Sequence, residues 1–146
     1  MTLSIMQISV FLENKSGTLA NLTSVLAENK VNLQAMNVAE TSEFGIVRMI
    51  VEDVYNAANI LKEEGYVCKL TPVVAITIGD TPGSLNDTIS ILNTAGIDVD
   101  YMYAFLGGRA KDTAHIILKV ADNSAAEAAL RAKGVELLTQ EEAGEL

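Results

Sequence analysis

The chain begins with alternating apolar and polar residues and then changes to a helical spacing. In residues 6–12 every even position is apolar, which predicts a strand with one buried face. After a loop around Gly17, apolar residues recur three and four positions apart, which predicts an amphipathic helix ending near Asn29. These apolar residues are Leu19, Leu22, Val25 and Leu26.

A hairpin, a second helix and a short strand complete the first half of the chain. Residues 31–40 and 44–52 read as two strands with a turn between them. A second helical spacing begins at Val54, and Gly65 can end that helix by taking a positive φ. Residues 66–70 read as a last strand. The order βαββαβ predicts an α+β, ferredoxin-like unit, in which both helices cover one face of a four-stranded antiparallel sheet.

The same pattern occurs a second time. Residues 14–19 (Asn-Lys-Ser-Gly-Thr-Leu) correspond to residues 80–85 (Asp-Thr-Pro-Gly-Ser-Leu), and this offset of 66 continues through the next helix and strand. Beyond the hairpin the offset becomes 69, since Gly65 then corresponds to Gly134. The three extra residues predict a longer, glycine-rich hairpin tip around Gly107. Two copies of one unit therefore fill the chain.

The repeats place a domain boundary at Thr71-Pro72. We expect one domain over residues 1–71, a second over 72–139, and an acidic, solvated tail at 140–146. Domains of this size bury only about 60% of their unfolded surface and are marginally stable alone. Several apolar residues lie off the helical faces, and covering them predicts a homodimer. They are Ile5, Phe11, Ile46, Ile50 and Ile117.

Composition excludes several classes of partner. The net charge is −9 and only 5% of residues are aromatic, so the surface repels phosphate backbones and offers few rings for stacking on bases. We therefore expect no nucleic-acid partner. A single cysteine, Cys68, excludes an internal disulfide and fits a reducing compartment. Without a long apolar run or a basic leader, the chain reads as a cytoplasmic protein that does not enter a membrane.

Two loops carry the residues that suggest chemistry. Gly17 and Gly83 each stand between a strand and a helix, where backbone can approach a ligand closely. The first amides of the following helix lack internal partners and can bind a carboxylate. The alternative is that each glycine only permits a tight turn. Asn14 and Asp80 precede these loops, and their oxygens can accept hydrogen bonds from a ligand ammonium or cap the helix.

Other polar and aromatic residues are less informative. Asn32 and Asp98 align at the start of the second strand of each copy, where alternation alone would also place a polar residue. The only histidine, His115, has the phase of the sheet face without helices, and a metal pair would need another histidine. Three aromatic residues share one face of a strand, which is typical of core packing, with a ligand side-chain pocket as the alternative. They are Tyr101, Tyr103 and Phe105.

Both loops, with the strand and helix around them, resemble the opening of an ACT domain, the regulatory amino-acid-binding module of enzymes in amino-acid metabolism. The first copy of this opening is Val10 to Leu19 with Val31-Asn32-Leu33, and the second is Ile76 to Leu85 with Ile97-Asp98-Val99. Together the copies cover nearly the whole chain, so the sequence is similar to stand-alone tandem ACT proteins.

The resemblance implies that two ACT units pair side by side into one eight-stranded sheet and bind effectors at their junction. The loop of one unit and the second strand of its neighbour commonly build the site. One site would combine Asn14 and the amides of Gly17, Thr18 and Leu19 with Asp98. The other would combine Asp80 and the amides of Gly83, Ser84 and Leu85 with Asn32. The second copy has Asp at both positions where the first has Asn, so the two sites differ.

Two functions remain in competition. We expect a non-catalytic regulatory protein that binds a free amino acid and uses no cofactor, with an enzyme of amino-acid metabolism as a partner. Catalysis is not expected, because acylphosphatases of this fold need an arginine in the loop and no P-loop or Ser or Cys with a His partner is present. The alternative is a protein-interaction module or regulatory subunit without its own ligand, resembling the small subunit of acetolactate synthase.

Overall fold

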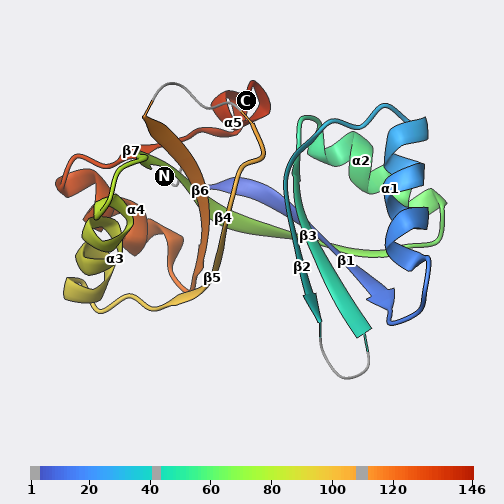
Figure 1. Cartoon of the computed structure of the whole chain (residues 1–146), viewed down its shortest axis with the longest axis horizontal. Coiled ribbons are helices and arrows are strands. Elements are labelled where there is room, and N and C mark those ends of the chain that lie inside the picture. The colour runs from blue at the N-terminus through green and yellow to red at the C-terminus, as the bar shows by residue number, and fades with distance from the viewer. Residues whose placement is uncertain (1–3, 41–43, 108–111) are drawn as a thin grey trace. The chain divides into compact units, whose positions relative to one another are not determined.

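A computed structural model of the chain describes residues 4–40, 44–107 and 112–146 (Figure 1). These residues fall into two units. One unit is Met6–Thr71, and the other is Pro72–Leu146 together with the N-terminal residues up to Ile5. The turn expected at 41–43 and most of the hairpin tip expected near Gly107 lie outside the described residues.

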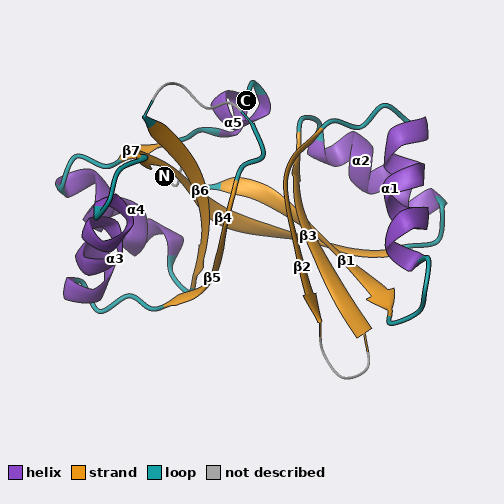
Figure 2. Ribbon diagram, viewed as in Figure 1, coloured by secondary structure: helices purple, strands orange, loops and turns teal. Residues whose placement is uncertain are grey.

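The unit Met6–Thr71 has the expected βαββαβ order. Its elements are β1 (Ile5–Glu13), α1 (Thr18–Glu28), β2 (Leu33–Glu40), β3 (Phe44–Val51), α2 (Val54–Glu63) and the beginning of β4 (Val67–Gly79). The strand order is β2-β3-β1-β4, and β3 is antiparallel to both β1 and β2. Figure 2 shows α1 and α2 on the same side of these strands. The ferredoxin-like prediction is confirmed for this unit.

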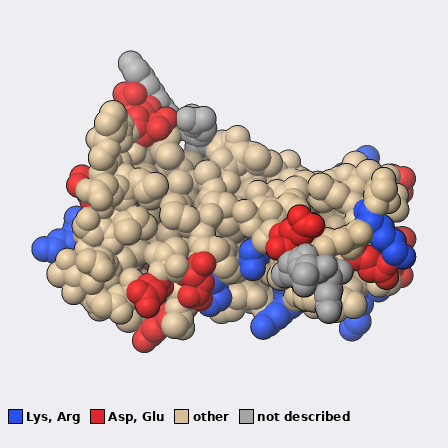
Figure 3. Space-filling model, turned by 60° about the horizontal axis from the view of Figure 1, so that its bottom comes forward, with Lys and Arg blue, Asp and Glu red and all other residues tan. Residues whose placement is uncertain are grey.

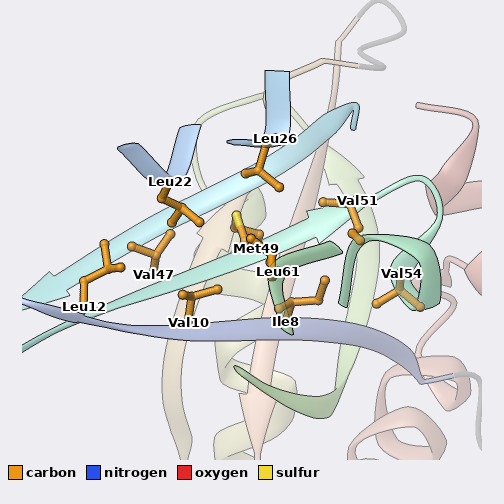
Figure 4. Packing of buried hydrophobic residues seen from close by; sticks show 11 residues of the cluster. Ile8, Val10, Leu12, Leu22, Leu26, Val47, Met49, Val51, Val54 and Leu61 are labelled. Carbon is orange, nitrogen blue, oxygen red and sulfur yellow. The ribbon is translucent and has the colours of Figure 1, made fainter. Parts of the chain in front are cut away.

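Alternation along the strands builds the core of this unit. Every second residue of β1 and β3 faces the helices. Val10 and Val47 are two of these residues; they lie opposite each other in the register, and both side chains are fully buried. Figure 4 shows these side chains converging beneath α1 and α2. Burying each large aliphatic side chain contributes about 1.5–3 kcal/mol before entropy is counted. The buried cluster is Ile8, Val10, Leu12, Leu22, Leu26, Val47, Met49, Val51, Val54, Ala57 and Leu61.

The second unit repeats this architecture. Its elements are the rest of β4, α3 (Ser84–Thr94), β5 (Val99–Ala104), β6 (Thr113–Val120), α4 (Asn123–Ala132), β7 (Glu136–Leu137) and α5 (Gln140–Gly144). The strand order is β7-β4-β6-β5, again antiparallel. A separate core, which includes Ile76, Leu92, Leu118 and Leu130, lies between the sheet and the helices α3 and α4. Among the described residues, no helix has the length and apolar character needed to cross a membrane.

The helix ends behave as the sequence indicates. Gly65 and Gly134 follow α2 and α4 with φ of +87° and +80°, so both take the positive φ that ends a helix. At the other end, Asp53 and Asp122 cap these helices by accepting hydrogen bonds from the amides three residues later, at 3.2 and 3.1 Å. Helices α1 and α3 differ, because their N-cap residues are glycines.

The junction of the repeats is more regular than expected. The sequence suggested two strands separated at Thr71-Pro72, but one strand, β4, runs through both residues. Pro72 is exposed, and its carbonyl accepts a hydrogen bond from Nδ2 of Asn123 at 3.1 Å. The described residues therefore contain seven strands where we expected eight.

The C-terminal segment corrects the prediction of a solvated tail. Residues 140–144 form the short helix α5, and its N-terminus carries a capping box. The Thr139 hydroxyl accepts from the Glu142 amide at 3.2 Å, and the Glu142 carboxylate accepts from the Thr139 amide at 3.0 Å. Ala143 is fully buried and Leu138 is 4% exposed. This apolar burial and the capping box explain why the segment is ordered despite its acidic composition.

Three of the apolar residues that suggested a dimer are already covered. Ile5, Ile50 and Ile117 are fully buried in the single chain, while Phe11 and Ile46 are half-buried. The expectation that all five need a second copy for cover is therefore wrong for these three. The exposed large apolar side chains of the described residues are others, among them Val38, Tyr55, Val67 and Leu106.

Candidate functional site

The two glycine loops have nearly the same backbone. Gly17 has φ 88° and ψ −9°, and Gly83 has φ 91° and ψ −15°, so both lie in the left-handed region that glycine tolerates. Each glycine accepts the first hydrogen bond of its helix, at 2.9 Å, from Asn21 and Asp87 respectively. No side chain caps either helix from the N-cap position. The loops therefore begin both helices with backbone alone.

Hydroxyl groups hold each loop in place. The Thr18 hydroxyl contacts the carbonyl oxygens of Glu13 and Lys15, both at 3.1 Å, while Ser84 and Thr81 share a hydroxyl hydrogen bond of 2.7 Å. The amides of Thr18 and Ser84 already donate to loop carbonyls, at 3.4 and 3.2 Å.

The next amide in each helix is differently placed. The amides of Leu19 and Leu85 have no acceptor among the described residues, as expected in the first turn of a helix. These two are therefore better placed to bind a carboxylate than the amides of Thr18 and Ser84. Both residues are also about two-fifths exposed, with Leu19 at 40% and Leu85 at 42%.

An open cavity of ≈ 290 Å³ lies beside the first loop, within the unit Met6–Thr71. It brings together three predicted site residues, Asn14, Thr18 and Leu19. The other residues around it come from β1, the loop and the end of the β2–β3 hairpin. They are Leu12, Glu13, Lys15, Val38, Glu40, Gly45 and Val47.

The hairpin residues around this cavity were missed by the sequence analysis. Strand register places them on the helix-bearing face, since Gly45 lies opposite both Leu12 and Glu40, and Val38 lies opposite Val47. A signal was present, because a glycine inside a strand pattern often marks a close approach of other atoms. At Gly45 the approaching atom is Oδ1 of Asn14, 3.4 Å from the position of an added Cβ.

Charged groups surround the mouth of the cavity. Lys15 and Glu13 form an ion pair of 2.6 Å with both side chains 71% exposed. The hydrogen bond from Lys15, and then its charge, lower the pKa of Glu13 below its usual value of 4.5, and the same contacts raise the pKa of Lys15. An ion pair this exposed adds little stability. Figure 3 shows acidic and basic side chains interspersed on one face of the molecule.

Asn32 and Asp98 lie apart from the loop of their own unit. Both residues are exposed and lie just before the strands β2 and β5 rather than inside them. Asn32 lines a small pocket of ≈ 110 Å³ beyond the C-terminal end of α1. The 11 residues of α1 span about 16 Å, so Asn32 does not join Asn14 within one unit. The pairing of each loop with the second strand of the other unit stays a prediction.

The second loop has its own contacts. The Asp80 amide donates to the carbonyl of Asp112 at 2.7 Å, which ties this loop to the strand β6 side of the hairpin. A Cβ on Gly79 would lie 3.1 Å from the Ser84 hydroxyl oxygen, so Ser84 occupies the space beside that strand end. The hydroxyl groups of Thr81 and Ser84 thus hold the second loop from within.

His115 lies on the sheet face without helices, as expected, but that face does not expose it. Its side chain is only 9% exposed, and its Nδ1 shares a hydrogen bond of 2.8 Å with the Thr77 hydroxyl. The imidazole meets the ring of Phe105 edge to face, with centroids 6.1 Å apart. Tyr103 and Phe105 are also buried, which favours the packing interpretation of these aromatic residues. Within the described ranges, no group of three His, Cys, Asp or Glu side chains could hold a metal ion.

Comparison with known proteins identifies the repeated unit. The family model of the ACT domain pair matches residues 1–144. A Bacteroides thetaiotaomicron protein known from its crystal structure is 34% identical, with 99% of both chains covered and a TM-score of 0.91. No curated protein matches the chain.

Two more distant structures share the fold. The ligand-free regulatory subunit of aspartate kinase from Thermus thermophilus has a TM-score of 0.65 and 18% identity over 89% of this chain and 90% of its own. The Thermus flavus regulatory subunit has a TM-score of 0.59 and 15% identity over 87% and 90%. The family match spans nearly the whole chain and agrees with the duplicated βαββαβ order, so this protein belongs to the family of ACT domain pairs.

Proposed function

We propose that this ACT domain pair is a non-catalytic regulatory protein that binds a free amino acid. The observation that carries the proposal is the first loop, where a left-handed glycine begins α1 and the loop adjoins a cavity lined by Asn14. The Leu19 amide, without an acceptor among the described residues, suits an α-carboxylate at the N-terminus of this helix. The Asn14 carboxamide oxygen suits the ammonium group.

Two sites follow from the duplication. In each, loop amides would hold the carboxylate, and a polar side chain from the second-strand region of the other unit would complete the site. The first consists of Asn14, Gly17, Thr18, Leu19 and Asp98. The second consists of Asp80, Gly83, Ser84, Leu85 and Asn32. Each site would then combine one carboxamide with one carboxylate, in opposite positions.

The proposal includes a partner and an assembly. A protein with a regulatory role must pass its bound state to another molecule, and the Thermus proteins that share this fold are regulatory subunits of an enzyme. We therefore place an enzyme of amino-acid metabolism as the partner, in the cytoplasm. A homodimer is proposed for two reasons. β2 is an edge strand of the first unit and β5 of the second, and exposed apolar residues remain on the surface, including Val38 in β2.

The test is a thermal-shift panel of the twenty amino acids with the purified protein. A ligand that binds only the native state at a hundredfold excess over Kd adds about 2.7 kcal/mol of stability. For a chain of this length, each kcal/mol moves the melting temperature by roughly 2–4 °C. The matched control is the N-acetylated form of any amino acid that shifts the transition, because it lacks the ammonium group. If no amino acid acts, or if the acetylated form acts equally well, the interaction-module alternative replaces this proposal.

A further inference from the structure

We infer that the two loops are not equivalent, and that the first-loop cavity binds an uncharged, aliphatic α-amino acid. This inference rests on the proposed function and adds to it the location and class of the ligand. Three features support it: the apolar floor of the cavity, its charged mouth, and the residues that replace the charged groups and Gly45 in the second repeat.

The floor of the cavity is apolar. Leu12, Val38 and Val47 share the helix-bearing face of the sheet and line the cavity, and Leu19 lines it from α1. Among these residues Val38 is 52% exposed, so its side chain is accessible from the cavity. A charged ligand side chain placed on this floor would lose water without gaining a partner there. An aliphatic side chain would bury apolar surface at no such cost.

The charges lie at the mouth. Glu13 and Lys15 neutralise each other through their ion pair, which leaves Glu40 as an additional negative charge among the lining residues. This arrangement favours a ligand with an ammonium group, such as an amino acid, over a ligand whose only charge is negative. The α-carboxylate would then lie toward the N-terminus of α1, and the side chain toward Val38 and Val47.

Gly45 is the residue that leaves room beside Asn14. Its φ is outside the left-handed region, and a Cβ there would meet Oδ1 of Asn14 at 3.4 Å and the carbonyl oxygen of Ala39 at 3.7 Å. Both are ordinary contact distances, so alanine fits the fold but places a methyl group against Asn14. The volume of ≈ 290 Å³ equals the share of about ten liquid water molecules, which is enough for an amino acid with a short side chain.

The second repeat keeps the apolar positions but differs at the others. Leu12, Val38 and Val47 correspond to Ile78, Ala104 and Ile116, which are also apolar. By the offsets of 66 and 69, Gly45 corresponds to Ala114 and Glu40 to Leu106. The Glu13–Lys15 pair is likewise replaced, by Gly79 and Thr81, and Thr81 bonds to Ser84 instead. The second repeat therefore has no counterpart of the Glu13–Lys15 pair or of Glu40 at the aligned positions, and it has a methyl group at the position that Gly45 leaves open.

The first experiment measures ligand class by titration calorimetry on the full chain. The probes are alanine, 2-aminobutyrate, norvaline and leucine, with aspartate and lysine as charged probes. Affinity should rise by up to about fourfold for each added CH₂ group until the cavity is full. Aspartate and lysine should bind weakly or not at all. A charged amino acid that binds more tightly than the aliphatic series would overturn the inference and leave the proposed function standing.

The second experiment locates the site with a matched pair of variants. Gly45→Ala places in the first repeat the residue that the second already has, and Ala114→Gly makes the reverse change. Gly45→Ala should weaken aliphatic binding by about tenfold or more, as one methyl group too many does in a fitted pocket. Ala114→Gly should leave the Kd unchanged. Melting temperatures of both variants verify that they fold.

Each further outcome decides the question. If Ala114→Gly changes the Kd while Gly45→Ala does not, the ligand binds at the second loop and the inference is wrong. The inference is also wrong if both variants bind as the original protein does, because the position of Gly45 then has no effect on the ligand. If no amino acid binds the unaltered protein, the proposed function fails, and the inference fails with it.

Discussion

Asn14 and Gly45 lie against each other at one end of the first sheet, with Oδ1 of Asn14 3.4 Å from the position of a Cβ on Gly45. Asn14 directly follows β1 and Gly45 is the second residue of β3, so the contact joins the loop before α1 to the hairpin. Both residues line the same cavity. The loop with the candidate binding groups thus contacts β3, and the sequence of the loop alone does not identify this contact.

Gly17→Ala should lower the free energy of unfolding by about 1–2 kcal/mol. The φ of 88° is the reason, because left-handed backbone brings Cβ close to the following carbonyl oxygen. Apart from the glycine itself and its two chain neighbours, no atom lies within 4 Å of an added Cβ, so packing against the rest of the fold contributes nothing. Urea denaturation measures the change. Gly45→Ala is the control, because its φ is not positive and its stability should not fall. Equal loss in both variants would contradict this account, whereas a smaller loss for Gly17→Asn would agree with it.

The elements that were predicted well are those with local signals. Short stretches of sequence determine the helix spacing, the helix ends at Gly65 and Gly134, and the 66-residue offset. The structure and the family match agree with these predictions. The continuity of β4 through Pro72 was not predicted, because it depends on whether the missing N–H faces a neighbouring acceptor. That is a property of the folded sheet rather than of the dipeptide.

The error at the C-terminus and the unpredicted burial of His115 have different origins. Thr139 and Glu142 have the spacing of a capping box, so the start of α5 was readable and was obscured by the acidic composition. The burial of His115 could not be predicted from the sequence. Its position in the alternation of β6 indicates which face of the sheet it lies on, but not what covers that face. Gly45 is an intermediate case. A glycine within a strand pattern indicated a close approach of other atoms, but the contacting residue, Asn14, lies 31 residues earlier and could not be identified.

Acid should loosen α5 before it affects the two cores. The hydrogen bond from the Thr139 amide lowers the pKa of Glu142 below 4.5, so the carboxylate is favoured in the folded state. The ionised Glu142 carboxylate therefore stabilises the folded segment above pH 4.5, and this stabilisation is lost as the pH falls through the lower pKa of the folded state. Hydrogen exchange at the Ala143 amide, corrected for intrinsic rates, should therefore accelerate below that pH.

Glu142→Gln is the control for the acid effect. Its neutral amide can still accept a hydrogen bond from the Thr139 amide but lacks the negative charge that strengthens this bond. Exchange at Ala143 should therefore be faster than in the original protein at neutral pH and nearly independent of pH below 4.5. If the variant retains the full acid response, another carboxylate is responsible and the capping box is not the cause.

The protein should be a dimer at micromolar concentration. β2 is an edge strand of the first unit and β5 of the second, and such edges can pair with another chain. Val67 and Leu106 are each 66% exposed. Light scattering should give twice the chain mass of 15.6 kDa. Since Ile5, Ile50 and Ile117 are buried without a second copy, dissociation on dilution should leave a folded monomer. A mass of 15.6 kDa throughout the micromolar range would contradict the dimer.

His115→Ala should destabilise the protein without changing amino-acid binding. The substitution removes the hydrogen-bond partner of the Thr77 hydroxyl and the ring packed against Phe105, and we expect a loss of about 1–3 kcal/mol. Thr77→Val removes the hydroxyl while keeping most of the shape, so its effect should be smaller. His115 is not among the residues around the first-loop cavity, so the calorimetric Kd of the best aliphatic ligand should be the same in both variants and in the original protein. A variant of unchanged stability that no longer binds would instead place His115 in the ligand site, contrary to the packing interpretation.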